Sequence, residues 1–157
     1  MLLYKESIRK YLIKAIDLQI IISLITFIFL YAIMFGIKVT LLILAKSVIP
    51  ISIGYLSMLM LIYLLPNIIN FKKKPILKSI FIQFFLLVIS IFLGAFAFML
   101  QELLFGGSDY SVFRWDDYIN LSISLTYVCV IFGGIQTLII GVWLGCKIRN
   151  LQLENHQ

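Results

Sequence analysis

The charged residues of this chain are spaced so that they leave four long uncharged runs, at residues 18–37, 47–69, 79–101 and 118–146. Of the 157 residues, 62% are hydrophobic and only 13% are charged. Each run reaches the roughly 20 residues that an α-helix needs to cross the hydrocarbon core of a bilayer. Because backbone groups in lipid must find hydrogen-bond partners within the protein, each run is predicted to be a helix. The sequence therefore predicts an all-α fold, an integral membrane four-helix bundle.

The basic residues are unevenly distributed between the two sides of this predicted bundle. Four precede the first run, four lie between the second and the third, and two follow the fourth, so ten of the thirteen fall on one side. The other side holds only Lys38, Lys46 and Arg114, together with most of the acidic residues. Loops rich in lysine and arginine stay in the cytoplasm. Both termini are therefore expected in the cytoplasm (N-in/C-in), with the chain in the cytoplasmic, or inner, membrane.

The charged segments that flank the runs set the expected domain boundaries. Residues 1–17 mix leucine and isoleucine with basic residues. This pattern predicts a cytoplasmic amphipathic segment that lies on the membrane surface or extends the first span. Residues 18–146 are expected to form the four-span bundle, and residues 147–157 a cytoplasmic helical tail. The apolar stretch at 37–45 is too short to span, so it is expected to be an outer turn or the start of the second helix.

Residues that usually carry catalysis or bind metals are scarce. The only histidine is His156, and Cys129 and Cys146 lie 17 residues apart in one run. No catalytic set, cofactor site or metal site is therefore predicted, and the chain is not expected to be an enzyme. No ionisable residue falls deep inside a run, which argues against proton-coupled transport. The basic residues lie at helix ends, where topology explains them, so the expected partner is the lipid bilayer and not a nucleic acid.

The predicted outer loop at residues 101–118 is rich in aromatic and charged side chains. One interpretation is a small recognition surface for a cation, a peptide or a lipid headgroup. The other, which we favour, is an aromatic belt at the membrane interface beside a solvated loop. The candidate recognition residues are Asp109, Tyr110, Arg114, Trp115, Asp116 and Asp117.

The fourth run carries small residues at helical spacing. Gly134, Gly141 and Gly145 share one face, and small residues let helices approach closely in lipid. Packing within the bundle is favoured over dimerisation. Ile148 and Leu151 continue a 3-4 spacing beyond the run, which is the beginning of a seam between two helices. A homodimer or a membrane-protein partner is the corresponding expectation.

Two segments resemble a known family. The segment YLLPNIINFKKKPILKSIF at residues 63–81 has an aliphatic-proline-basic junction, and the fourth run continues directly into KIRNLQLENHQ at 147–157. In these features the chain resembles the N-terminal multi-span membrane domain of LytS-like sensor histidine kinases, whose last span leads into a dimerising kinase module. The resemblance covers spans two to four and the tail, and it rests on hydrophobicity and junctions. The family's His-Phe-Leu-Phe-Asn phosphoacceptor run and its ATP-binding region are absent from the 157 residues.

The resemblance implies a membrane-embedded sensor input module for signal transduction that lacks a catalytic domain. A shift of the fourth span would rotate or slide the Ile148/Leu151 seam. Two alternatives stay open. One is a small membrane immunity or partner protein directed against a membrane-active toxin. The other is an accessory subunit of a small transporter or flippase. The high isoleucine and lysine content is typical of a bacterium with an AT-rich genome.

Overall fold

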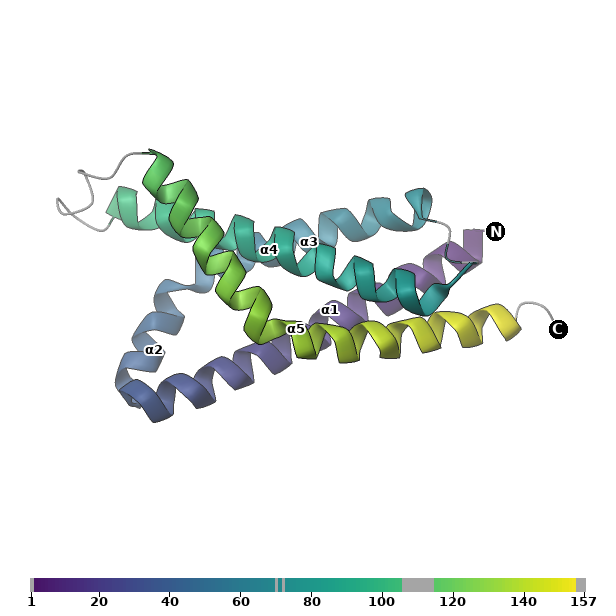
Figure 1. Cartoon of the computed structure of the whole chain (residues 1–157), viewed down its shortest axis with the longest axis horizontal. Coiled ribbons are helices and arrows are strands. Elements are labelled where there is room, and N and C mark those ends of the chain that lie inside the picture. Colours follow the sequence, from purple (N-terminus) through teal and green to yellow (C-terminus); the bar gives the residue numbers. More distant parts are fainter. Residues whose placement is uncertain (1, 70, 72, 106–114, 155–157) are drawn as a thin grey trace.

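The computed structural model describes residues 2–69, 71, 73–105 and 115–154, and all regular structure within these ranges is α-helical (Figure 1). This confirms the all-α prediction. The helices are α1 (Leu2–Phe35), α2 (Ile37–Lys46), α3 (Val48–Ile68), α4 (Pro75–Phe105) and α5 (Trp115–Glu154).

Three helices in the described ranges are long and apolar enough to cross a membrane. They are Lys5–Phe35 of α1, Val48–Ile68 of α3 and Pro75–Phe105 of α4. Many of their apolar side chains are exposed, as expected for side chains that face lipid. The prediction of transmembrane helices is therefore confirmed for these three segments.

The helices do not begin and end where the charges do. α1 is a single helix from Leu2 to Phe35, so the described part of the N-terminal segment extends the first apolar helix and is not a separate surface helix. It ends at Gly36, whose φ of 82° lies in the left-handed region that glycine adopts readily. The stretch after Gly36 is neither a turn nor the start of α3, but a separate helix of 10 residues, α2. Charges mark where a helix leaves lipid, and they need not interrupt its backbone hydrogen bonds.

The long helices bring four of their termini together. The start of α1, the end of α3, the start of α4 and the end of α5 lie at one end of the molecule, which we call the terminal end (Figure 1). The junction of α1 and α2, the end of α4 and the start of α5 lie at the opposite end, the loop end. α5 packs most extensively on α4, and α3 covers another side of α4. α1 contacts both α3 and α5.

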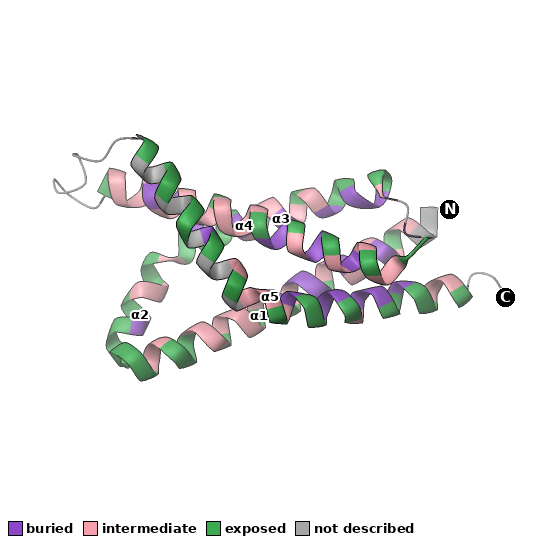
Figure 2. Ribbon diagram, viewed as in Figure 1, coloured by how far each residue is buried: buried purple, intermediate pink, exposed green. Residues whose placement is uncertain are grey.

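The buried core lies in the half of the molecule toward the terminal end, where all four long helices meet (Figure 2). Each helix contributes side chains about one turn apart, because residues three and four apart share a helix face. The buried members are Ile8, Leu12, Ala15 and Ile16 of α1; Met58, Ile62 and Leu65 of α3; Phe71; Ile82 and Leu86 of α4; and Ile140, Leu144 and Ile148 of α5.

Toward the loop end the helices separate. α5 bends about midway along its length, and its first half diverges from α1 (Figure 1). Gly133 and Gly134 lie at the middle of this helix, and glycine-containing pairs are common sites of helix bending. The second half of α1 is exposed on most sides, with Phe29 65% exposed and Met34 70% exposed. The molecule is therefore tightly packed at the terminal end and open at the loop end.

Candidate functional site

The small residues of α5 form its contact with α4. A Cβ atom added to Gly141 would lie 2.8 Å from the Cα of Ile80, and one added to Gly145 would overlap the Cα of Ile76. Gly134 has more room, since its added Cβ would lie 3.7 Å from the ring of Phe84. The glycine face is thus occupied within the chain, and it lets the two helix backbones touch.

The two residues expected to form a seam between two copies also face the chain's own helices. Ile148 is fully buried in the core at the terminal end. Leu151 is half-buried and lines a groove beside Tyr11 and Lys14 of α1. A second copy could reach Ile148 only if this core opened.

A set of polar side chains connects α1 to the middle of α5. Gln19 donates from Nε2 to the Thr137 hydroxyl at 2.8 Å. The Ser23 hydroxyl donates to Oε1 of Gln136 at 3.2 Å, and Nε2 of Gln136 donates to the Thr26 hydroxyl at 3.2 Å. Gln19 and Thr137 are buried, so their hydrogen bond is shielded from water. These bonds set the register of α1 against α5 next to the α5 bend.

Asp17 of α1 makes a contact that was not foreseen from the sequence. Its carboxylate accepts a hydrogen bond from the Tyr55 hydroxyl of α3 at 2.9 Å. Tyr55 lies about 10 Å along α3 from its loop end and about 20 Å from its other end. Asp17 lies inside the candidate span Lys5–Phe35. The expectation that no ionisable residue lies within a span depended on starting the first span after Asp17. In the sequence, the only indication of this contact was that Asp17 lies directly before the first apolar run.

Three further pairs of residues connect the helices at the terminal end. The Arg9 guanidinium lies 4.8 Å from the centre of the Tyr63 ring and donates to the Tyr63 carbonyl at 3.3 Å. Lys5 donates to the Asn67 side-chain oxygen at 3.2 Å. Gln152 donates to the Phe71 carbonyl at 2.8 Å. The start of α1 is thereby held against the end of α3, and the end of α5 is held against the connection between α3 and α4.

Two buried polar residues of α4 stand apart from these networks. Ser79 and Gln83 are fully buried one helical turn apart. The Ser79 hydroxyl and both polar atoms of the Gln83 amide have no hydrogen-bond partner among the described residues. Buried polar groups without partners are rare and costly, so these two side chains weaken the packing of α4.

The candidate recognition loop falls largely outside the structural description. Asp109, Tyr110 and Arg114 lie outside the described residues, whereas Trp115, Asp116 and Asp117 form the first turn of α5. Asp116 is exposed. Recognition by this loop stays a prediction.

At the loop end, α2 and α4 are fastened to each other. Lys46 forms an ion pair with Glu102 at 3.5 Å. Gln101 donates to the Lys46 carbonyl at 3.0 Å. The end of α2 is therefore anchored near the end of α4 while its other side chains stay mostly exposed.

The described residues contain no group of three or more histidine, cysteine, aspartate or glutamate side chains that could hold a metal ion. What these residues do form is a set of helix contacts along α5: tight at Gly141 and Gly145, polar at Gln136 and Thr137, and open toward the loop end.

No protein-family model matches this chain, and no curated protein or solved structure matches it either. The resemblance to LytS-like sensor kinases therefore stays an interpretation of the sequence.

Proposed function

We propose that this protein is a membrane-embedded signal-transduction module in which α5 carries a displacement from the loop end to the terminal end. The observation that supports this proposal is the continuity of α5, a single helix of 40 residues, about 60 Å long. Such a helix exceeds the thickness of a bilayer and connects the candidate recognition loop to the charged tail.

In this proposal α5 is the fourth transmembrane span, and both termini lie in the cytoplasm of a bacterium. The basic residues support that orientation. Arg9, Lys74, Lys147 and Arg149 all belong to the terminal end, where the chain carries most of its lysine and arginine. Membrane proteins retain such segments in the cytoplasm.

The contacts of α5 with α1 divide it into a second half that is held against α1 and a first half that diverges from it. Its second half is held against α4 by the glycine contacts and against α1 by the Gln19–Thr137 bond. Its first half diverges from α1 beyond the bend. A displacement of the first half would therefore pass through the bend and cause a small rotation or slide of the second half. Helix shifts of this kind are a common mode of switching.

Any second copy or other partner of the tail would meet the outward face of α5. Cys146, Asn150 and Leu153 are exposed and follow a 4-3 spacing, so they share one face. Ile148 faces the opposite way, into the core. We propose that a homodimer, if α5 mediates it, uses the Cys146–Asn150–Leu153 face.

The test joins the chain after Glu154, in helical register, to the catalytic module of a dimeric sensor histidine kinase. Cys129 and Cys146 are replaced by serine, and a bulky maleimide label is attached to Asp116→Cys, an exposed position in the first turn of α5. The label is expected to change autophosphorylation. The matched control is the same label at Lys38→Cys, which is exposed on α2 and should leave the output unchanged.

Alanine insertions after Glu154 make this test specific for transmission by a helix. Each inserted alanine rotates the following helix by about 100°, so one to four insertions should alter the size and sign of the label effect with helical period. Flexible glycine-serine insertions of equal length should abolish the effect. Equal responses to the Asp116 and Lys38 labels, or no response at any insertion length, would contradict transmission through α5.

One observation favours a second candidate, a membrane partner protein of the immunity type. Phe29, Ile33 and Met34 are at least 65% exposed on the part of α1 that the other helices leave uncovered. A partner helix could pack there. A photo-crosslinking residue at Ile33 should then capture one discrete protein in cells, whereas the same residue at Phe81, also exposed, should not. Capture of lipid alone at both positions would exclude this candidate.

A further inference from the structure

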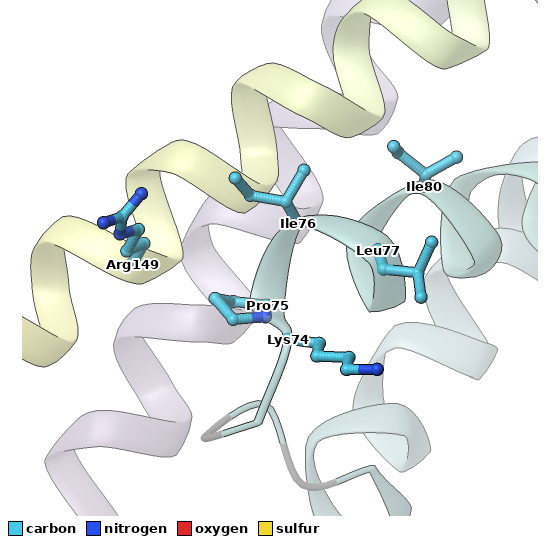
Figure 3. Close-up of a pocket in the computed structure, with 6 residues that line it drawn as sticks. All are labelled: Lys74, Pro75, Ile76, Leu77, Ile80 and Arg149. Atoms are coloured by element: carbon cyan, nitrogen blue, oxygen red, sulfur yellow. The ribbon is translucent and has the colours of Figure 1, made fainter.

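A shallow groove with a volume of about 400 Å³ lies at the terminal end, between the first turns of α4 and the end of α5 (Figure 3). In Figure 3, Lys74 and Arg149 lie on either side of Pro75, while Leu77 and Ile80 continue the groove along α4. Its walls are therefore apolar along α4 and cationic at one end. The lining residues are Lys74, Pro75, Ile76, Leu77, Ile80 and Arg149.

The charges of this groove are not neutralised by the described part of the chain. Lys74 and Arg149 are exposed, and neither forms an ion pair with a described carboxylate. The first turn of α4 contains no acidic residue. The positive end of the α4 dipole also points to this region, which adds to the attraction for an anion. The groove is thus an apolar surface with an uncompensated positive end.

The backbone conformation of Lys74, at the same site, is unusual for a residue with a side chain. Its φ of 52° lies in the left-handed region, where a side chain is disfavoured and glycine is the usual residue. The position also precedes Pro75, the first residue of α4. A lysine here places a cation beside the groove at a backbone cost that glycine would avoid. Unfavourable backbone conformations of this kind concentrate at ligand sites.

We propose that this groove binds one anionic phospholipid of the surrounding leaflet. The headgroup phosphate lies against Arg149, and an acyl chain lies along Leu77 and Ile80. Lys74, on the other side of Pro75, adds to the attraction for the anion. The guanidinium of Arg149 can donate two parallel hydrogen bonds to a phosphate, and basic pockets at the membrane surface select anionic headgroups. Leu77 is 51% exposed, so its side chain is available to an acyl chain. The site depends on membrane insertion of α4 and not on any signalling role.

Tryptophan quenching by brominated lipids tests this site on the full chain. Trp115 and Trp143 are replaced by phenylalanine, and Leu77→Trp places the reporter in the groove. The chain is reconstituted in phosphatidylcholine nanodiscs that contain a minor fraction of brominated phosphatidylglycerol or of brominated phosphatidylcholine. We expect several-fold stronger quenching by the anionic lipid. The control reporter, Phe81→Trp, is 68% exposed one turn along α4 outside the groove and should show no preference.

Charge variants then assign the preference to the two cations. The double variant Lys74→Gln/Arg149→Gln should abolish the anionic preference at Leu77→Trp, since each basic residue is expected to contribute about fivefold to the affinity for an anionic lipid. Lys147→Gln removes the same charge from an exposed position near Arg149 that does not line the groove, and it should leave the preference nearly intact. Soluble glycerol phosphate should not displace the brominated lipid, since it has no acyl chain to occupy the apolar wall.

Lys74→Gly separates binding from folding. Glycine suits the left-handed backbone, so this variant should keep the thermal stability of the chain while losing the anionic preference. Equal quenching by the two brominated lipids at Leu77→Trp would overturn the proposal. An equal loss of preference in Lys147→Gln and in Lys74→Gln/Arg149→Gln would overturn it as well, because it would show a general surface attraction.

Discussion

Two glutamines are buried in the core at the terminal end, and they differ in their hydrogen bonding. Gln19 donates to Thr137, whereas neither polar atom of Gln83 has a partner among the described residues. Both side chains are almost fully enclosed. The free energy of a buried amide depends on whether its hydrogen bonds are replaced, so the two residues should contribute to stability with opposite signs.

The first prediction compares leucine at these two positions. Gln83→Leu removes an unsatisfied amide and should raise the free energy of unfolding by about 1–3 kcal/mol. Gln19→Leu removes a hydrogen bond and should lower it by roughly 0.5–1.5 kcal/mol. Thermal unfolding of both variants in the same mild detergent measures the difference. Destabilisation by both would show that Gln83 has a partner in the membrane.

The second prediction concerns the glycine contact with α4. Gly145→Ala places a methyl group against the Ile76 backbone, which should destabilise the fold by about 1–3 kcal/mol. Gly133→Ala is the matched control. Its added Cβ would lie 3.7 Å from the Leu87 side chain, an ordinary contact, and alanine favours helix by up to about 1 kcal/mol. Unfolding transitions of the two variants should therefore shift in opposite directions. Equal shifts would contradict the close approach of α4 and α5 at Gly145.

At the scale of residues, the sequence identified the surfaces but not their partners. Helical spacing placed Gly134, Gly141 and Gly145 on one face, and the structure sets the last two against Ile80 and Ile76. Spacing along one helix carries no information on the register of a second helix, so these partners could not be predicted. Asp17 was missed because the first span was taken to begin after the last charge, although α1 continues through it.

At the scale of elements, an apolar run long enough to span lipid and the helix that contains it have different boundaries. Helix α1 extends the first predicted span by more than a dozen residues toward the N-terminus, and α5 joins the fourth predicted span to the tail without a break. Hydrophobicity indicates where a chain enters lipid. A helix continues until a residue such as Gly36 permits another conformation. The presence of long apolar helices was therefore easier to predict than their boundaries.

The third prediction locates the face of α5 that can meet a second copy. Cysteines at 146, 150 and 153 should form disulfide-linked dimers in membranes if α5 mediates a homodimer, since Cys146, Asn150 and Leu153 are exposed on one face. These positions are tested one at a time without Cys129 and, for the latter two, without Cys146. Ile148→Cys is the buried control and should give no dimer.

The opposite crosslinking pattern would show that the core at the terminal end opens. Strong dimer bands at Ile148→Cys and Leu151→Cys, with none at the outward face, would mean that two copies meet along the Ile148/Leu151 seam predicted from the 3-4 spacing. In the membrane, the packing of α5 against α1 and α4 would then differ from the packing described above.

At the scale of the whole molecule, packing is uneven along its length. Side chains from all four long helices fill the core at the terminal end, and Arg9, Lys5 and Gln152 fasten it. The loop end has few such contacts, apart from the Lys46–Glu102 pair. The charge pattern in the sequence correctly grouped the termini with the connection between α3 and α4. It carried no information on where the core lies, because apolar side chains serve both core and lipid-facing surface in a membrane protein.

We propose that α5 crosses the membrane with its tail in the cytoplasm, and cysteine labelling from either side of the membrane tests this orientation. Asp116→Cys and Asn150→Cys are both exposed, near opposite ends of α5. On a background without Cys129 and Cys146, a membrane-impermeant maleimide is applied to intact cells and to lysed cells. If α5 crosses the membrane in the proposed orientation, Asp116→Cys is labelled in intact cells and Asn150→Cys only after lysis. Labelling of both positions from the same side would show that α5 does not cross the membrane.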